Sequence, residues 1–212
     1  MDLPLSNLGL FLVAALALNL APGPDMLYVM ANGLRGGPRC GVVAALGIGG
    51  GALIHGAAAA LGVSALIATS PLAFDLLRYA GAAYLAWLGI KAIREPGATL
   101  EAAWPGSSRL WPIFFQGVVT NVLNPKVALF FLAFLPQFAE PSRGSVGVQV
   151  LFLGLLFNTS GTIVNIAVGL GASGIGRRLA TAPLFARVQR WVCGVVFIGL
   201  ACRLLAGERA AR

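Results

Sequence analysis

Long apolar stretches, nearly free of charge, dominate the hydropathy pattern of the chain. No Asp, Glu, Lys or Arg occurs in residues 40–74 or 144–176, and Asp25 is the only one in residues 3–26. A helix needs about 20 consecutive apolar residues to cross the hydrocarbon core of a bilayer. The pattern therefore predicts an all-α integral membrane protein.

The apolar stretches separate into six predicted transmembrane helices. The segments between them are rich in Gly, Pro and Arg, as in RGGPR, EPSRG and GRRLATAP, and such segments break helices. None is long enough to form a domain, so we predict a single transmembrane domain over residues 1–212. The expected helices are Leu5–Gly33, Gly41–Thr69, Leu72–Ile93, Trp111–Phe138, Val146–Ile175 and Leu184–Leu205.

The composition supports a membrane protein and excludes other classes. Hydrophobic residues make up 58% of the chain and charged residues 10%, whereas a soluble domain has about 25% charged residues. The start of the chain lacks a basic n-region, so the first apolar segment is expected to stay in the protein. The three cysteines have no metal-ligand or disulfide spacing, so we expect no metal and no cofactor.

The distribution of Lys and Arg predicts the orientation. Nine of the 15 lie in the first, third and fifth loops, and five lie on the opposite side. Because basic residues gather on the cytoplasmic side, both termini are predicted to lie outside. The same clustering explains the net charge of +8 without a nucleic-acid partner. The nine are Arg35, Arg39, Lys91, Arg94, Arg109, Arg177, Arg178, Arg187 and Arg190, and the five are Arg78, Arg143, Arg203, Arg209 and Arg212.

The two halves of the chain resemble each other at offsets of 101, 107 and 112 residues. Because each half would hold three helices, the second half would enter the membrane upside down relative to the first. We therefore predict two inverted repeats, over about residues 5–94 and 111–205, an arrangement that recurs in secondary transporters. The matched patterns are Pro24-Asp25 with Pro125-Lys126, Gly47 and Gly62 with Gly154 and Gly169, and Arg78-Tyr79 with Arg190-Trp191.

Two of the predicted helices contain residues that interrupt a helix. Pro22, Gly23 and Pro24 lie past the middle of the first, and Pro125 lies close to the centre of the fourth. Proline removes a backbone donor and clashes with the preceding turn, so both helices are predicted to be broken. A break leaves main-chain groups without intrahelical partners, which lipid does not tolerate but a water-filled cavity does.

Polar side chains gather at about the same depth in four of the predicted helices. A charge at the centre of a membrane helix costs roughly 2.5–3.5 kcal/mol on insertion scales, so Asp25 and Lys126 are expected to be functional. For the uncharged residues, hydrogen bonding between helices is the alternative. The predicted substrate-binding or coupling residues are Asp25, Lys126, Asn124, Asn121, His55, Asn158, Thr159, Thr162 and Asn165.

These features predict a transporter for a small zwitterion. Asp25 or carbonyl groups freed at a break would hold an ammonium group. Lys126, or the positive N-terminal end of the half-helix after Pro24, would hold a carboxylate. Asp25 is also the expected coupling residue, with a proton or another ion as the coupling partner. The sequence leaves homo-oligomerisation open.

Four stretches also resemble a known family: APGPDMLYV, ALGIGGGALIHGAAAALG, LLRYAGAAYLAWLGIKAIR and TNVLNPKVALFFLAFLPQF. From about Leu18 to the tail, the chain resembles the lysine exporter and homoserine–threonine exporter (LysE/RhtB) family. The resemblance implies a gradient-driven exporter of amino acids in the bacterial inner membrane, with six transmembrane helices. The outside termini would then be periplasmic.

One position departs from the family pattern. The resemblance implies an acid just after the glycine run in many relatives, but this chain has Ala52 there, with His55 three residues later. With one buried acid, neutral amino acids such as homoserine or threonine are expected over lysine or arginine.

Two alternative functions compete with amino-acid export. A cation exporter is disfavoured because hard cations prefer several oxygen ligands. An intramembrane hydrolase would need Ser160 as nucleophile within hydrogen-bond reach of His55 as base. We expect a transporter and not an enzyme.

Overall fold

All regular elements of the described residues are helical. The computed structural model describes residues 5–69, 71–94, 109–172 and 183–206. Its α-helices are α1 (Leu5–Leu20), α2 (Pro24–Thr69), α3 (Pro71–Arg94), α4 (Leu110–Val122), α5 (Pro125–Leu129), α6 (Val146–Ala172) and α8 (Pro183–Ala206). After α5 come a π-helical turn, η1 (Phe130–Phe134), and two 3-10 turns, η2 (Leu135–Phe138) and η3 (Pro141–Arg143). The predicted all-α class is confirmed.

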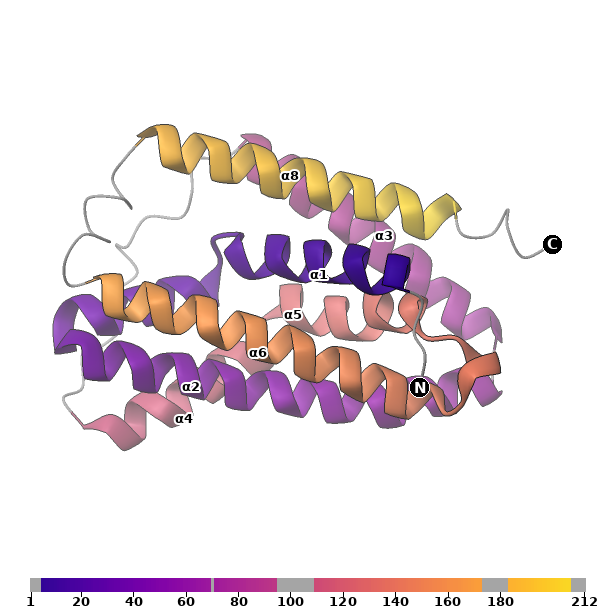
Figure 1. Ribbon diagram of the computed structural model, residues 1–212, viewed down its shortest axis with the longest axis horizontal. Coiled ribbons are helices and arrows are strands. Elements are labelled where there is room, and N and C mark those ends of the chain that lie inside the picture. The colour runs from indigo at the N-terminus through magenta and orange to yellow at the C-terminus, as the bar shows by residue number, and fades with distance from the viewer. Residues whose placement is uncertain (1–4, 70, 95–108, 173–182, 207–212) are drawn as a thin grey trace.

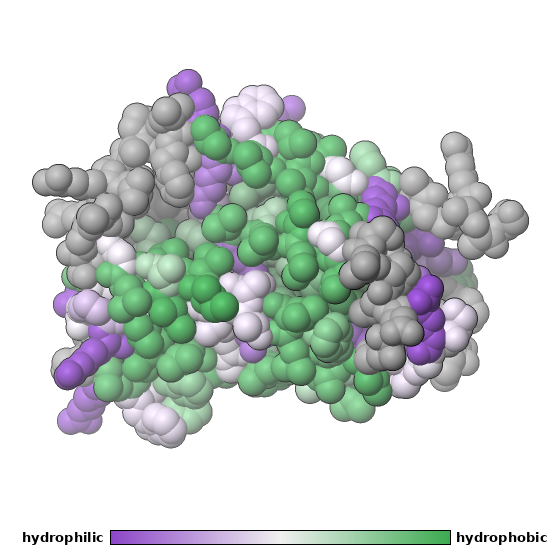
Figure 2. All heavy atoms as spheres, viewed as in Figure 1, coloured by the Kyte–Doolittle hydropathy of each residue, from purple (hydrophilic) through white to green (hydrophobic). Residues whose placement is uncertain are grey.

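Within the described residues, three helical segments are long and apolar enough to cross a membrane: Pro24–Gly62, Val146–Ala172 and Arg187–Leu205. Leu110–Val122 and Pro125–Phe138 meet that condition only as a pair bent by 52°, and Leu8–Leu20 is a shorter apolar helix. Figure 2 shows hydrophobic residues over most of the middle of this face, apart from a narrow strip of more polar residues near its centre, and strongly hydrophilic residues mostly towards the ends of the molecule. A lipid-facing surface accounts for this band, because a water-exposed surface rarely carries so large an apolar area.

The helices run back and forth along the long axis of the molecule (Figure 1). α1 and the first part of α2 run the same way, and the chain turns back at Gly37. There φ is 78° and ψ is −177°, a combination that is nearly restricted to glycine. Without this turn, the 46 residues of α2 would form a rod of about 69 Å, far longer than a bilayer core of about 30 Å. α1 begins and α8 ends at the same end of the molecule (Figure 1).

Glycine allows α2 to pack closely between α4 and α6. A Cβ atom on Gly41 would lie 2.7 Å from the carbonyl oxygen of Gly169 in α6. On the other face, a Cβ atom on Gly51 would lie 2.8 Å from the carbonyl oxygen of Val118 in α4. Residues without side chains let helix backbones touch. α3 packs on α8, and α1 contacts both α6 and α8.

Phenylalanine side chains fill the core between α1, α6 and the segment that follows α5. The ring of Phe11 lies 6.4 Å from that of Phe130 and 5.5 Å from that of Phe138. Phe157 of α6 lies 4.7 Å from Phe130 and 5.2 Å from Phe131. All five rings are buried, and their packing ties the two halves of the chain together.

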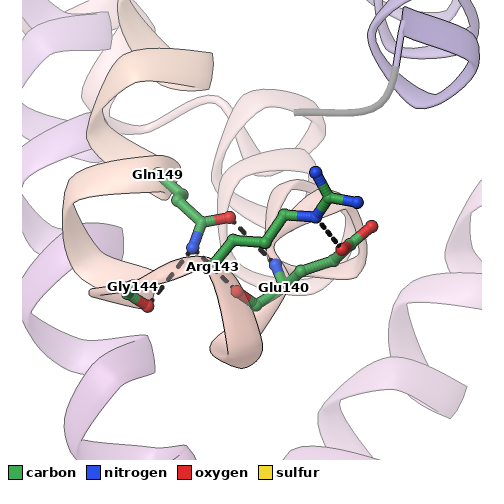
Figure 3. Close-up of polar contacts among 4 residues, drawn as sticks. All are labelled: Glu140, Arg143, Gly144 and Gln149. Atoms are coloured by element: carbon green, nitrogen blue, oxygen red, sulfur yellow. Dashed lines mark hydrogen bonds and ion pairs between the residues drawn. The ribbon is translucent and has the colours of Figure 1, made fainter. Parts of the chain in front are cut away.

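The connection between η2 and α6 is held by the buried side chain of Gln149 (Figure 3). Its Nε2 donates to the carbonyl oxygens of Glu140 at 2.9 Å and Gly144 at 3.3 Å, and its Oε1 accepts from the N–H of Glu140 at 2.9 Å. Arg143 forms an ion pair with the Glu140 carboxylate. One amide side chain thus satisfies the main chain of a loop that regular helix bonds do not reach.

The predicted helix breaks are present, and some predicted boundaries are wrong. α1 stops at Leu20 and α4 at Val122, as Pro24 and Pro125 require. The predicted second helix was to start at Gly41, but helical structure resumes at Pro38, because proline suits the first turn of a helix. The predicted fourth helix does not end as α-helix but as π and 3-10 turns. Ile175, Arg177, Arg178, Arg209 and Arg212, which entered the predictions, lie outside the described residues.

We expect Gly169→Ala to destabilise the protein, because the added methyl group would lie 2.8 Å from the carbonyl carbon of Gly41. Overpacking of this kind costs about 1–3 kcal/mol. Gly62→Ala is the matched control, since a Cβ atom there meets nothing within 4 Å and alanine favours helix over glycine by about 1 kcal/mol. Thermal unfolding in detergent should give a lower midpoint for the first variant only. Equal midpoints would contradict the close contact.

Candidate functional site

The first helix break exposes main-chain carbonyl groups in the interior of the molecule. Ala21, Pro22 and Gly23 separate α1 from α2. The last carbonyls of a helix have no intrahelical partners, and a buried acceptor without a donor costs about 1–3 kcal/mol. The end of α1 therefore requires donors from elsewhere in the chain.

Lys126 supplies two of these donors from the second break. Its Nζ donates to the carbonyl oxygens of Leu18 at 3.1 Å and Ala21 at 3.0 Å. Its ammonium also lies against Gly23, where a Cβ atom would come within 3.1 Å of Nζ. A cation at a helix C-terminus is favoured by the helix dipole as well. Lys126 thus closes the end of α1.

Two side chains of α8 complete the closure of α1. Gln189 Nε2 donates to the carbonyl oxygen of Leu20, and Cys193 Sγ donates to that of Ala17 at 3.4 Å. Four of the carbonyl groups in the last turn of α1 and the following residue therefore have side-chain donors from α5 or α8.

The second break is closed in a similar way. Leu123 and Asn124 separate α4 from α5, and Asn124 Oδ1 caps α5 by accepting from the N–H of Lys126 at 3.0 Å. His55 of α2 has its Nε2 3.1 Å from the carbonyl oxygen of Asn121, near the end of α4. Because a carbonyl only accepts, this nitrogen is the donor. The His55 ring also stacks on Phe131, with centroids 5.9 Å apart.

Asp25 lies after the first break and contacts the helix before the second break, just as Lys126, after the second break, contacts the helix before the first. It lies in the first turn of α2, where the positive end of the helix dipole favours an anion. Its Oδ2 accepts from Asn121 Nδ2 at 2.7 Å. The charged residue after each break therefore reaches the last turn of the helix that precedes the other break.

A cavity of about 30 Å³ lies where the two breaks meet. It has room for one or two water-sized groups. Asp25 provides the only carboxylate, and Lys126 the only ammonium group, among the described residues that line it. No group of three or more His, Cys, Asp or Glu suited to a metal occurs in the described part of the chain. The lining is Leu18, Asn19, Ala21, Asp25, Met26, Ile48, Gly49, Ala52, Asn121, Lys126, Val127, Phe157, Asn158, Gly161, Thr162 and Asn165.

Six of the nine predicted polar residues line this cavity: Asp25, Asn121, Lys126, Asn158, Thr162 and Asn165. The other three do not. His55 and Asn124 close the second break, as described above. Thr159 is exposed and donates to the carbonyl oxygen of Leu155 in its own helix, because it lies one residue, and so about 100° of rotation, from Asn158.

Asn19 is a cavity residue that the sequence prediction missed. Its Nδ2 donates to Ser160 Oγ at 3.0 Å and to the carbonyl oxygen of Phe157 at 3.3 Å. Its one sequence signal is an amide in an otherwise apolar turn just before the first break. Ser160 itself donates to the carbonyl oxygen of Phe157 at 2.9 Å. Ser160 and His55 thus have different partners, and they do not form the hydrogen-bonded pair that a hydrolase would use.

Comparison with known proteins identifies the family. The family model described as LysE type translocator matches residues 16–208. The chain is 32% identical over 203 residues to a leucine efflux protein of Enterobacter sp. (strain 638), covering 93% of this chain and 94% of the relative. A leucine efflux protein of Klebsiella pneumoniae is 31% identical over 199 residues, covering 92% of each chain. An uncharacterized membrane protein of Vibrio cholerae is 32% identical over 189 residues, covering 89% of this chain and 91% of the relative.

The chain therefore belongs to the LysE family of translocators, as its sequence motifs predicted. It is a multi-pass membrane protein of the transporter class. No solved structure matches the chain significantly.

We expect Lys126→Met to lower the thermal unfolding midpoint, because it leaves the carbonyls of Leu18 and Ala21 without their donor. Each buried acceptor left unpaired costs about 1–3 kcal/mol. Lys91→Met is the control, since Lys91 is exposed and lies over the Trp87 ring, a contact worth about 0.5–1 kcal/mol at an exposed site. An equal or larger loss in Lys91→Met would show that Lys126 does not hold the end of α1.

Proposed function

We propose that this protein is a secondary active exporter of amino acids in the bacterial inner membrane. The observation that carries the proposal is a single cavity, formed by two helix breaks, that both Asp25 and Lys126 line. Discontinuous helices that meet at the substrate are a recurrent construction of secondary transporters. The names of the relatives, leucine efflux proteins, support an amino acid as the exported solute.

The two charges suit the two ends of a zwitterion. The Asp25 carboxylate would accept from the ammonium group of the amino acid. Lys126 donates two of its three N–H groups to α1, so one remains for a carboxylate. Asn158, Thr162 and Asn165 of α6 and Asn121 of α4 add polar groups to the same cavity.

The lining favours a neutral amino acid. Leu18, Met26, Ile48, Val127 and Phe157 give the cavity an apolar part. A basic substrate would need a second acceptor charge, and the position where the family resemblance implies an acid in many relatives is here Ala52, which lines the cavity. We therefore propose aliphatic neutral amino acids such as leucine as substrates, ahead of the homoserine and threonine that the sequence suggested.

We also propose that the fold consists of two inverted three-helix repeats. The matched residues Asp25 and Lys126 make reciprocal contacts, each with the last turn of the helix before the other break or the residue that follows it. A two-fold relation in the membrane plane would produce this exchange.

The orientation would place both termini in the periplasm. Figure 1 shows the turn within α2, the end of α3 and the starts of α4 and α8 towards one end of the molecule. These segments hold seven of the basic residues expected on the cytoplasmic side: Arg35, Arg39, Lys91, Arg94, Arg109, Arg187 and Arg190. An alkaline phosphatase fusion at the C-terminus should be active, and an inactive one would reverse the orientation.

Purified protein in proteoliposomes is expected to catalyse counterflow of neutral amino acids. The panel contains labelled leucine, threonine, homoserine, lysine and arginine, with empty liposomes and a heat-denatured preparation as controls. Leucine should accumulate transiently against an excess of unlabelled leucine inside, and lysine and arginine should not. Counterflow of none of the five would contradict amino-acid transport, and counterflow of lysine alone would contradict the neutral preference.

Asp25→Asn is expected to abolish the acceleration of efflux by an imposed pH gradient while retaining exchange at saturating substrate. Asparagine can keep the hydrogen bond to Asn121 by turning its oxygen towards Nδ2, but it does not take up or release a proton. The measurement is efflux of the amino acid that gives the largest counterflow, with and without the gradient. If the gradient accelerates the variant as it does the wild type, Asp25 is not the coupling residue.

A further inference from the structure

The cavity contains an excess of free acceptor oxygens. Asp25 Oδ1, Asn121 Oδ1 and Asn165 Oδ1 are buried without a hydrogen-bond partner, and all three residues line the cavity. Asn121 is 2% exposed and Asn165 8% exposed. Buried polar groups are nearly always paired, so three unpaired oxygens beside one cavity require an explanation.

The orientation of the Asn121 amide follows from its chemistry. An ionised carboxylate oxygen only accepts, so with Asp25 ionised the amide atom 2.7 Å from Asp25 Oδ2 is the nitrogen. The amide oxygen of Asn121 is therefore the unpaired atom. Asp25 and Asn121 share one hydrogen bond, and each keeps one oxygen, Oδ1, without a partner.

Several donors around the cavity are used within the protein. Lys126 donates to α1, Asn19 to Ser160 and Phe157, and the Thr162 hydroxyl to Asn158 Oδ1 at 3.3 Å. Among the described residues that line the cavity, every buried side-chain atom without a partner is an acceptor. The free acceptor oxygens of such a site favour a ligand that is rich in N–H donors.

We propose that Asp25, Asn121 and Asn165 form a binding site for a primary ammonium group, and that this group is the α-ammonium of the exported amino acid. This inference rests on the proposed function. An alkylammonium head offers three N–H donors, matching three free oxygens, and a cavity of about 30 Å³ holds one group of that size. The ammonium group is the principal anchor of the substrate, and its carboxylate contributes less.

A monovalent metal cation such as Na⁺ shares the preference for oxygen ligands. Derivatives of the substrate show whether the ammonium group is the bound group. An amino-acid amide keeps the ammonium group and loses the carboxylate, whereas an N-acetyl derivative loses the ammonium group and keeps the carboxylate. Experiments in choline chloride instead of NaCl remove the metal ion.

The test is thermal protection of the purified full-length protein by leucine, threonine, their amides and their N-acetyl derivatives, all in choline chloride. The amide of at least one of the two should protect at concentrations within about tenfold of the amino acid. The N-acetyl derivatives should be weaker by about a hundredfold or more, because hydrogen bonds to a charged group are lost.

Asn165 offers a matched set of variants. Asn165→Leu removes the free oxygen and should weaken protection by the amide about tenfold. Asn165→Asp keeps an acceptor and adds charge, so protection should be retained or strengthened, which shows that the site folds. Asn32→Leu is the control, since Asn32 bonds to Tyr28 one turn earlier in its own helix and does not line the cavity.

Three results would overturn the ammonium site: no protection by either amide, protection by an N-acetyl derivative without its amide, or protection by NaCl alone that the amides do not reproduce. Protection by an amide together with no amino-acid counterflow would keep the site and refute the proposed export of amino acids. The two proposals therefore fail separately.

Discussion

The free carbonyl groups at the end of α1 are the constraint on which the centre of the molecule depends. A helix that stops inside a membrane leaves acceptors that neither lipid nor its own backbone can satisfy. Lys126 donates to Leu18 and Ala21, and Gln189 donates to Leu20, while Cys193 adds a second donor to the carbonyl of Ala17, which already accepts from the N–H of Ala21. These donors come from α5 and α8, so the break in α1 fixes the position of elements more than 100 residues later in the chain. The ammonium group of Lys126, whose burial in a membrane helix is unfavourable by itself, thus stabilises the fold.

The two kinds of helix contact have different mechanical properties. α2 and α6 touch through glycine backbone, as at Gly41 and Gly169, where a shift in either direction creates a void or a clash. At the breaks themselves, single side chains bridge one element to the next, such as Lys126 to the end of α1 and His55 to the end of α4. Hydrogen bonds of this type can exchange for bonds to water or substrate at small net cost. α4 packs on α2 in the same close way, through Gly51 and Val118, so α2, α4 and α6 form the frame, and the end of α1 is the part held by side-chain hydrogen bonds.

The sequence predicted the features that have a local signal: the helix breaks, indicated by proline, and the charged residues beside them. It placed both breaks, because Pro24 and Pro125 forbid a continuous helix, and it named both Asn158 and Thr162, which lie four residues apart and so share a face of α6. It missed Asn19 and Gln189, whose partners lie 141 and 169 residues away, since a single amide in an apolar turn has no periodic signal. It placed Thr159 with its neighbour Asn158, although adjacent residues on a helix point in different directions. α2 is longer than one membrane span because its two helical parts are joined by a turn of one residue, Gly37. The motif RGGPR predicted a connection between two helices, but it did not indicate that the connection is so short.

The volume of the cavity limits what this conformation can hold. About 30 Å³ accommodates a head group, whereas ligand sites that enclose a whole small molecule measure roughly 300–1,000 Å³. An amino acid can therefore be enclosed only after the lining moves. Widening cannot separate α2 from α6 without opening the Gly41 and Gly169 contact, so it must displace the apolar side chains Met26, Val127 or Phe157, or the half-helices that carry the first two. Because Asp25 is bonded to Asn121 across the breaks, a ligand that competes for either residue acts directly on the contact that holds the first part of α2 to the end of α4. Under the proposed function, substrate binding and a movement of the half-helices would be linked through this pair of side chains.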